Sequence, residues 1–433
     1  MSFHTGDTVE VTALDVAQGG WCVARPDDGP VIFVRHALPG ERVRARVTEV
    51  NSRFARAEAV EILQASPERI EAPCPSARPD GCGGCDWQHA SLPAQRALKA
   101  TVVSQQLRRL AGIDREVTVE PLPGDADGES GAGLGWRTRV QFAVRPDGRA
   151  GLRAHRSHEV VDVGDCLIAH PAIRDLGVPK LPWPGAESVE AITSGDECAV
   201  IVTPHRSPRS GKSSRSGKEG PDMVPPVAAD AVLTRAGRRL TPVRGRAYLR
   251  QHAAGRDWRV SAGAFWQVHP AAAGTLSAAV LAALEPEPGD AVLDLYCGAG
   301  LFAGALAPLV GPEGAVVGIE SDEAAVRDAR HNLRDTPWAR VHRGDVAQVL
   351  RRGGLPPARL AVADPPRAGL DRAVIEELSA GAAERFAYVS CDPATLARDL
   401  GLLLARDWRL EGLRAFDAFP MTHHVECVAT LTR

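Results

Sequence analysis

Long apolar runs are missing from this 433-residue chain, and none approaches the ~18 residues that a membrane-spanning helix needs. The first residues, MSFHTGDTVEV, lack both the basic and the apolar segment of a secretory signal. A large excess of one sign of charge is also missing, because 51 basic and 54 acidic residues leave a net charge of −3. We therefore expect a soluble, cytoplasmic protein with no membrane partner and without the strongly basic character of a dedicated nucleic-acid-binding domain.

Cysteine is scarce as well, with nine residues in the whole chain. Because the chain also lacks a secretory signal, we do not expect a disulfide framework. Their spacing carries more information than their number. Cys74, Cys82 and Cys85 gather in the Pro/Gly-rich stretch CPSARPDGCGGC. Three others lie in apolar, strand-like runs and are expected to be core residues: Cys22, Cys198 and Cys427.

The first half of the chain predicts a barrel, a helix and an α+β region. Short runs of alternating apolar and polar residues fill 4–63 and indicate a small five-stranded barrel of the OB type. A helix is expected over 93–111, where leucine and valine recur at helical spacing. Strands and loops follow over 117–258, with a hairpin turning at Pro146-Asp147-Gly148 and a low-complexity loop at 205–222.

A local excess of positive charge lies in residues 201–260, which hold 13 Arg or Lys residues against four acids. An RNA-binding surface would need such an excess, and a solvated basic face would explain it equally well. The pattern alone leaves both interpretations open.

From about residue 289, apolar strands alternate with helices. This pattern predicts an α/β fold whose C-terminal part is a doubly wound, mostly parallel sheet of the Rossmann-like type. Ligands of such sheets bind beyond the carboxyl ends of the strands. The motif DLYCGAG, residues 294–300, follows the first of these strands, Glu320 ends the second and Asp345 the third. A dinucleotide site is the rival interpretation, but the full G-x-G-x-x-G is absent, and the pattern favours a class I S-adenosylmethionine methyltransferase.

Two reactive side chains are expected at the same edge of the sheet. Cys391 ends the fifth strand next to Asp364 of the fourth, and Glu426 interrupts an otherwise apolar strand, where a carboxylate is costly unless it is paired or functional. In DPPR, Arg367 stands where enzymes that methylate exocyclic amines carry an aromatic residue. A thiol that adds to C6 of uracil and a carboxylate that removes the C5 proton would together permit methylation at C5.

These motifs, DLYCGAG, DPPRAG, SCDPATLARDL and FPMTHHVE, together with CGGCDWQHA, resemble the RNA uracil-5-methyltransferase family. The resemblance implies that Cys391 is the nucleophile and Glu426 the base, and that S-adenosylmethionine is bound by Gln267, Tyr296, Glu320, Asp345 and Asp364. It also implies a TRAM-like OB barrel at 1–63, a central iron–sulfur and RNA-binding domain at 64–92 and 118–258, and a methyltransferase domain at 93–117 and 259–433.

The same resemblance makes Cys74, Cys82, Cys85 and Cys166 the ligands of a [4Fe–4S] cluster, as in the ribosomal branch of the family. Zinc is the alternative, because a site of four cysteines suits it equally well. We expect a monomer that makes 5-methyluridine in 23S ribosomal RNA, with transfer RNA as the alternative substrate. A catalytically dead RNA-binding module is the alternative of another class, and the presence of both Cys391 and Glu426 counts against it.

Overall fold

The computed structural model describes residues 3–26, 29–125, 131–205 and 224–433. The chain divides into two compact units, the first being Met1–Pro79, Cys85–Gly133 and Ala271–Arg433, the second Asp80–Gly84 and Leu134–Pro270. The three-domain division expected from the sequence stays a prediction. Within the described residues, no helix is long and apolar enough to cross a membrane.

The N-terminal part of the first unit is a barrel-like sheet. Its strands are β1 (Thr8–Thr12), β2 (Asp15–Ala17), β3 (Trp21–Ala24), β4 (Val31–Arg35), β5 (Arg42–Val50) and β6 (Phe54–Gln64), in the order β1-β5-β6-β4-β3-β2. Alternation buries every second residue, so that Val43, Ala45 and Val47 of β5 enter the core while the intervening arginines stay outside it. In the described part of the barrel, β2 is a strand beyond the expected five, and its three residues are too short for a periodic signal.

Helix α1 (Leu92–Gln106) begins where Ser91 accepts a hydrogen bond from the backbone N–H of Ala94, and it continues as a π-helix, Leu107–Ala111. This confirms the helix expected over 93–111. Val102 of α1 packs with Val16 and Leu38 of the barrel and with Trp87 in one buried apolar cluster. The barrel is therefore joined to this helix by a shared core.

The rest of the first unit is a mixed sheet in the order β19-β18-β17-β20-β21-β23-β22-β7. These strands are β7 (Val119–Pro121), β17 (Ala291–Leu295), β18 (Ala315–Glu320), β19 (Ala339–Arg343), β20 (Leu360–Ala363), β21 (Arg385–Ser390), β22 (Arg409–Asp417) and β23 (Glu426–Thr432). Strands β17 to β21 are parallel to one another, and β23 runs antiparallel between β21 and β22. The doubly wound sheet expected from the sequence is thereby confirmed.

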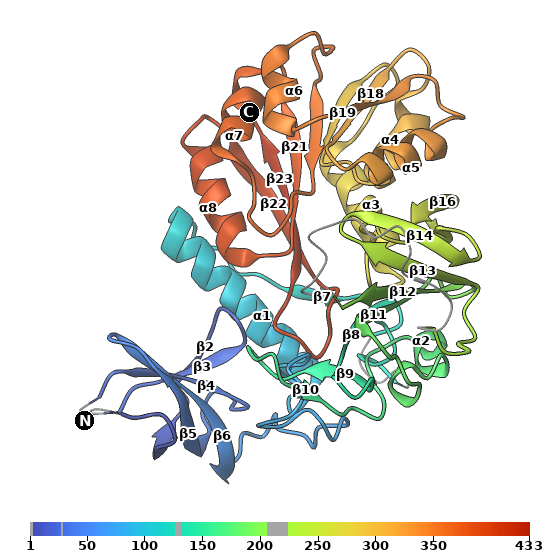
Figure 1. The fold of residues 1–433 in the computed structure, drawn as a ribbon. Coiled ribbons are helices and arrows are strands. Elements are labelled where there is room, and N and C mark those ends of the chain that lie inside the picture. The colour runs from blue at the N-terminus through green and yellow to red at the C-terminus, as the bar shows by residue number, and fades with distance from the viewer. Residues whose placement is uncertain (1–2, 27–28, 126–130, 206–223) are drawn as a thin grey trace. The chain divides into compact units, whose positions relative to one another are not determined.

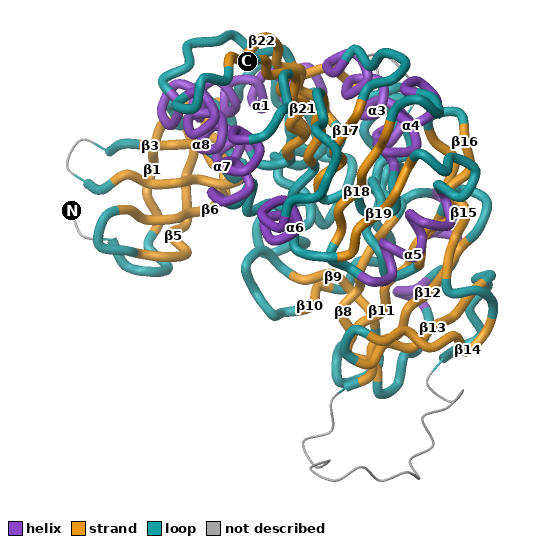
Figure 2. The backbone as a smooth tube through the Cα atoms, turned by 90° about the horizontal axis from the view of Figure 1, so that it is seen from above, coloured by secondary structure: helices purple, strands orange, loops and turns teal. Residues whose placement is uncertain are grey.

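Helices cover both faces of this sheet. They are α3 (Ala272–Leu284), α4 (Leu301–Val310), α5 (Glu323–Asn332), α6 (Val346–Arg352), α7 (Arg372–Ala380) and α8 (Pro393–Leu404). Figures 1 and 2 show α6, α7 and α8 on one side of the sheet and α3, α4 and α5 on the other. A large buried cluster lies beneath α7 and α8 and includes Ile375 and Leu396 of these helices with Phe386 and Tyr388 of β21.

The second unit contains a sheet in the order β10-β9-β8-β11-β12-β13-β14 and a separate β15-β16 pair. Its elements are β8 (Arg139–Val144), β9 (Ala150–Arg153), β10 (Val160–Val161), α2 (Pro171–Asp175), a 3-10 turn Val178–Lys180, β11 (Ala186–Thr193), β12 (Cys198–Pro204), β13 (Ala231–Ala236), β14 (Arg239–Arg244), β15 (Tyr248–Ala253) and β16 (Arg256–Ser261). Strands β8 and β9 form the hairpin expected at Pro146-Asp147-Gly148. Most of the loop expected at 205–222 lies outside the described residues.

Candidate active site

The expected site residues of the first unit gather at the carboxyl ends of the parallel strands. Tyr296 follows β17, Glu320 ends β18, Asp364 follows β20 and Cys391 follows β21. Because these strands are parallel neighbours in the sheet, their ends open on one edge. The clustering predicted from the sequence is therefore present.

The loop between β17 and α4 is strained in a way that suits a ligand site. Tyr296 has a φ of 63°, a left-handed conformation that is costly for a residue with a side chain. Gly298 and Gly300 have φ values of 53° and 90°, which only glycine adopts readily. A β-carbon on Gly300 would also lie 3.4 Å from the side chain of Ala329. The loop thereby brings backbone N–H groups to the N-terminus of α4, where a ligand can approach closely.

Two acidic residues of the expected cofactor site are already held by the backbone. Glu320 Oε2 accepts a hydrogen bond from the N–H of Gly298 (3.1 Å), and Oε1 accepts one from the N–H of Asp322 (2.7 Å). Asp345 caps α6 by accepting from the N–H of Gln348 (3.0 Å). Gln267, the remaining residue of this set, belongs to the second unit and is 7% exposed.

Buried negative charge marks this edge of the sheet. Burial raises the pKa of Asp294 to about 8. Its Oδ2 accepts a hydrogen bond from the N–H of Ala303 (2.8 Å), and its Oδ1 has no partner within the described part of the chain. Burial also raises the pKa of Asp364 to about 7. A positively charged ligand would lower the pKa of both carboxyl groups and favour their charged forms. S-adenosylmethionine carries such a charge on its sulfonium.

The sheet register places Cys391 opposite Glu426. Strands β21 and β23 pair in antiparallel register up to Ser390 and Cys427, and the next residues along the chain are Cys391, just after β21, and Glu426, the first residue of β23. Glu426 is 2% exposed and lies at the start of β23, where it also pairs with Phe416 of β22. The thiol and the carboxyl therefore come from neighbouring strands at the same end of the sheet.

The surroundings of both groups disfavour their charged forms. The pKa of the Cys391 thiol is raised to about 12, first by burial and then by the Glu426 and Asp364 carboxyl groups. The pKa of Glu426 is raised as well, by burial and then by Asp364. Arg367 acts in the opposite direction and lowers the pKa of both. A positive charge at Arg367 is therefore what favours the thiolate and the carboxylate here.

Sequence reasoning missed the residues that anchor Arg367. His424 Nε2 lies 3.2 Å from Arg367 Nη2. The fully buried carboxylate of Asp399, on α8, accepts from the N–H of Leu370 (2.8 Å) and from the Tyr388 hydroxyl (2.7 Å), which fixes the chain just after Arg367. An acidic residue among the apolar positions of α8 is the signal that could have identified Asp399.

The four cysteines expected to bind a cluster are divided between the units, with Cys74 and Cys85 in the first and Cys82 and Cys166 in the second. All four are half-buried. Gln88 links the first two, because its Oε1 accepts from the N–H of Cys74 (3.0 Å) and its Nε2 donates to Cys85 Sγ (3.2 Å). Among the residues that the structure describes, no group of three or more His, Cys, Asp or Glu side chains is placed to hold a metal ion.

The strand order, the glycine-containing loop before α4 and the acids at the strand ends define a class I methyltransferase. Three family models match the chain: tRNA (Uracil-5-)-methyltransferase over residues 358–433, TRAM domain over 3–60 and Methyltransferase domain over 286–350. The chain belongs to the RNA uracil-5-methyltransferase family, with S-adenosylmethionine as methyl donor and RNA as substrate.

Relatives match over nearly the whole chain. An RNA methyltransferase of Streptomyces avermitilis is 51% identical over 98% of both chains. The 23S rRNA (uracil(1939)-C(5))-methyltransferase of Pseudomonas putida is 33% identical over 93% of this chain and 89% of its own. The solved structure of a Pyrococcus abyssi tRNA (uracil-54, C5)-methyltransferase shares the fold, with a TM-score of 0.70 and 23% identity over 98% of this chain and 100% of its own.

Proposed function

We propose that this enzyme methylates C5 of a uridine in 23S ribosomal RNA through a covalent bond between Cys391 and C6 of the base. The observation that carries the proposal is the register of β21 and β23, which sets Cys391 opposite Glu426. A thiol and a carboxyl at neighbouring strand ends suit a reaction that needs a nucleophile and a base near one carbon atom. The target uridine must leave its stack, because a thiol cannot reach C6 within one.

The proposed steps balance as follows. The Cys391 thiolate forms a bond to C6, and the electron pair of the C5–C6 double bond passes into an enolate. C5 then takes the methyl group, breaking its bond to sulfur and releasing S-adenosylhomocysteine. Glu426 removes the proton from C5, the C5–C6 double bond re-forms and the bond between C6 and Cys391 breaks.

We propose that Gln267, Tyr296, Glu320, Asp345 and Asp364 bind S-adenosylmethionine, which supplies an electrophilic methyl group and a positive sulfonium charge. The carboxylate of Glu320, held at Gly298, suits ribose hydroxyls as donors. A cationic ligand fits beside Asp364, whose pKa is raised, and beside buried Asp294, whose Oδ1 has no partner among the described residues. Asp345 belongs near the adenine.

The experiment that tests the covalent mechanism uses the Glu426→Gln variant. The amide keeps the shape of the side chain but cannot remove the C5 proton, so the thiol addition and the methyl transfer should proceed and the release should stall. With substrate RNA and methyl-labelled S-adenosylmethionine, we expect a labelled band that migrates slowly in a denaturing gel.

The matched control is the double variant Cys391→Ala/Glu426→Gln, which should give no such band because the bond to C6 cannot form. Near-normal turnover by Glu426→Gln, with no trapped band, would show that another group is the base. Trapping that persists in the double variant would remove Cys391 from the mechanism.

The choice of 23S ribosomal RNA is supported by the 33% identity to the Pseudomonas putida enzyme, which extends over 93% of this chain. Mapping 5-methyluridine in ribosomal and transfer RNA from a strain that lacks the gene tests it directly. Loss from 23S ribosomal RNA alone is the expected result, and loss from transfer RNA alone would overturn it. Because the nucleophile and the base both come from one chain, we propose that the enzyme acts as a monomer.

We also propose that Cys74, Cys82, Cys85 and Cys166 hold a [4Fe–4S] cluster, which requires four thiolates. The proposal is supported by four half-buried cysteines and by hydrogen bonds donated to sulfur, as from the N–H of Gly84 to Cys82 Sγ (3.4 Å). No step of methyl transfer is assigned to a cluster. Protein purified without oxygen should contain iron and sulfide, and Cys166→Ser should lose both. Zinc without iron would contradict the proposal.

A further inference from the structure

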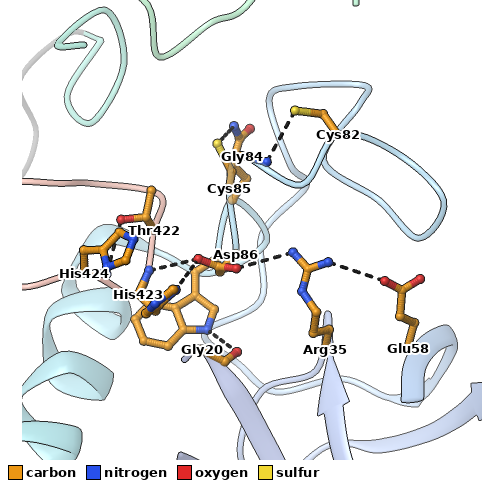
Figure 3. Close-up of polar contacts among 12 residues, drawn as sticks. Gly20, Arg35, Glu58, Cys82, Gly84, Cys85, Asp86, Thr422, His423 and His424 are labelled. Atoms are coloured by element: carbon orange, nitrogen blue, oxygen red, sulfur yellow. Dashed lines mark hydrogen bonds and ion pairs between the residues drawn. The ribbon is translucent and has the colours of Figure 1, made fainter. Parts of the chain in front are cut away.

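Asp86 lies at the centre of a polar network in the first unit, drawn in Figure 3. Its Oδ2 accepts hydrogen bonds from the ring Nδ1 of His423 (2.6 Å) and from the backbone N–H of the same residue (3.2 Å). Its Oδ1 accepts from Arg35 Nη2 (3.3 Å), and Arg35 Nη1 donates to Glu58 (3.4 Å). The Asp86 and Arg35 side chains are only 9% and 3% exposed, so solvent screens these contacts little.

The backbone around Asp86 holds the same loop. The N–H groups of Asp86 and Trp87 both donate to the carbonyl of Met421, at 2.9 and 3.1 Å. Met421 itself has a φ of 66°, and its N–H donates to Gln95 of α1 (2.8 Å). The loop 418–425, which leads directly into Glu426, is therefore fixed by the cysteine-rich segment on one side and by α1 on the other.

The neighbouring histidine connects this network to the active site. His424 Nε2 lies 3.2 Å from Arg367 Nη2, and because a guanidinium only donates, the ring nitrogen must be the acceptor. His424 is then neutral, in agreement with its pKa, which burial and the nearby His423 and Arg367 lower to about 3. The rings of His423 and His424 lie 4.0 Å apart, so the position of one limits the position of the other.

We propose that Asp86 is a positioning residue for methyl transfer: it fixes His423 against Arg35 of the barrel, and His424 then holds Arg367 beside Cys391 and Glu426. Asp86 does not touch the reacting groups, and its effect passes through the two histidines. Arg367 is exposed, so its guanidinium needs such a contact to stay in one orientation. The inference rests on the proposed roles of Cys391 and Glu426.

The test is Asp86→Asn, which keeps the size of the side chain but loses its charge and one of its acceptor oxygens. With only one acceptor, the amide cannot serve both Arg35 and His423. We expect the alkylation of Cys391 by iodoacetamide, followed by peptide mass spectrometry across pH, to become about three- to tenfold slower at a given pH. This is the range expected when an oriented positive charge beside a thiol is lost, since one pKa unit is a tenfold change in thiolate. In methylation assays kcat should fall while the Kd of S-adenosylmethionine stays the same.

The matched control is Asp114→Asn, which removes an exposed aspartate that accepts from Arg108 (2.7 Å) and should change neither rate. His423→Phe removes the ring nitrogen that donates to Asp86 and should reproduce the effect, which keeps the test valid if Asp86→Asn does not fold. Metal content is measured in every variant, because Asp86 follows Cys85. An unchanged alkylation profile in both folded variants would overturn the proposal. Alkylation needs no RNA, so a failure of the covalent mechanism in the trapping experiment would be seen separately.

Discussion

Lys99 on α1 donates a hydrogen bond to the carboxylate of Asp417 at the end of β22, and their side chains are 0% and 1% exposed. Lys99 Nζ also donates to the carbonyl of Phe419 (3.0 Å). Burial lowers the pKa of Lys99, and Asp417 counteracts this. The pair joins α1 to the start of the loop that leads to Glu426. Helix α1 therefore supports the active site although it carries none of the proposed catalytic residues.

Replacing only one partner of this pair should be strongly destabilising. In Lys99→Met the Asp417 carboxylate stays buried without its cation, and such changes cost about 3–5 kcal/mol. Urea denaturation followed by circular dichroism measures the loss. The double variant Lys99→Met/Asp417→Leu removes both charges and should recover most of it. Additive losses in the double variant would show that the two residues do not stabilise the protein as a pair.

The barrel reaches the active site through the turn between β2 and β3. Gln18 Nε2 donates to Oδ2 of Asp392 (3.1 Å), the residue after Cys391. Gly20 accepts a hydrogen bond at its carbonyl from Trp87 Nε1 (3.2 Å), and a β-carbon there would lie 3.0 Å from the β-carbon of His423 and 3.1 Å from that of Asp86. The barrel thus contacts the residue that follows Cys391 and the loop that leads to Glu426.

Gly20→Ala should therefore impair catalysis as well as stability. Its φ of +80° strains any side chain, at a cost of about 1–2 kcal/mol, and the new methyl group would push against His423. Gly6→Ala is the control, because Gly6 has a φ of +96° with nothing within 4 Å of its β-carbon. Melting temperatures should fall in both variants, and kcat only in Gly20→Ala. Equal kcat values in the two would mean that the turn does not influence the site.

Much of the catalytic sheet could be predicted because each strand is marked by a short apolar run in its own sequence. Apolar runs such as AVLDLYC and RFAYVSC predict buried strands, and the parallel order brings their ends together. The Asp86–His423 pair could not be predicted in this way. It joins residues more than three hundred positions apart, and neither belongs to a periodic pattern.

The ionisation of Cys391 was also beyond the sequence. The reference pKa of a free thiol, ~8.5, would leave a few per cent of thiolate at neutral pH. In the structure, burial and two nearby carboxyl groups raise the pKa to about 12, and this desolvation depends on residues from several strands. The thiolate of Cys391 is therefore less favoured in the ligand-free protein than that of a free cysteine, and the positive charge of Arg367 partly opposes this effect.

The two cysteines at the ends of parallel strands should differ sharply in function. Cys391→Ala should abolish methylation, because no other described thiol faces Glu426 from the end of β21. Cys297 is 5% exposed, and its sulfur packs close to Gly318. A β-carbon added to Gly318 would lie only 2.9 Å from this sulfur. Cys297→Ala should therefore weaken S-adenosylmethionine binding through looser packing and leave chemistry intact. Isothermal titration and single-turnover methylation separate the two effects, and full turnover by Cys391→Ala would make it a packing residue.

The stability of the ligand-free enzyme should fall as pH rises from about 4.5 toward 8. Glu426, Asp364 and Asp294 all have folded-state pKa values above their unfolded values, those of Asp364 and Asp294 being about 7 and 8. In that window the unfolded chain releases protons that the folded protein keeps, so each such group reduces stability by up to about 1.4 kcal/mol per pH unit. Below the unfolded pKa both states are protonated, and the effect disappears.

Glu426→Gln replaces one of these three titratable carboxyl groups with an amide of similar volume. It also removes a negative charge next to Asp364. We expect the variant to melt at the same temperature as the wild type near pH 4 and at a higher temperature at pH 8, with the difference opening as pH rises. Glu116→Gln, at an exposed position, is the control and should follow the wild type throughout. If Glu426→Gln were less stable at pH 8, the carboxylate would be ionised and stabilised in the folded protein. Its buried position at the start of β23 would then be structural, and the base would have to be sought elsewhere.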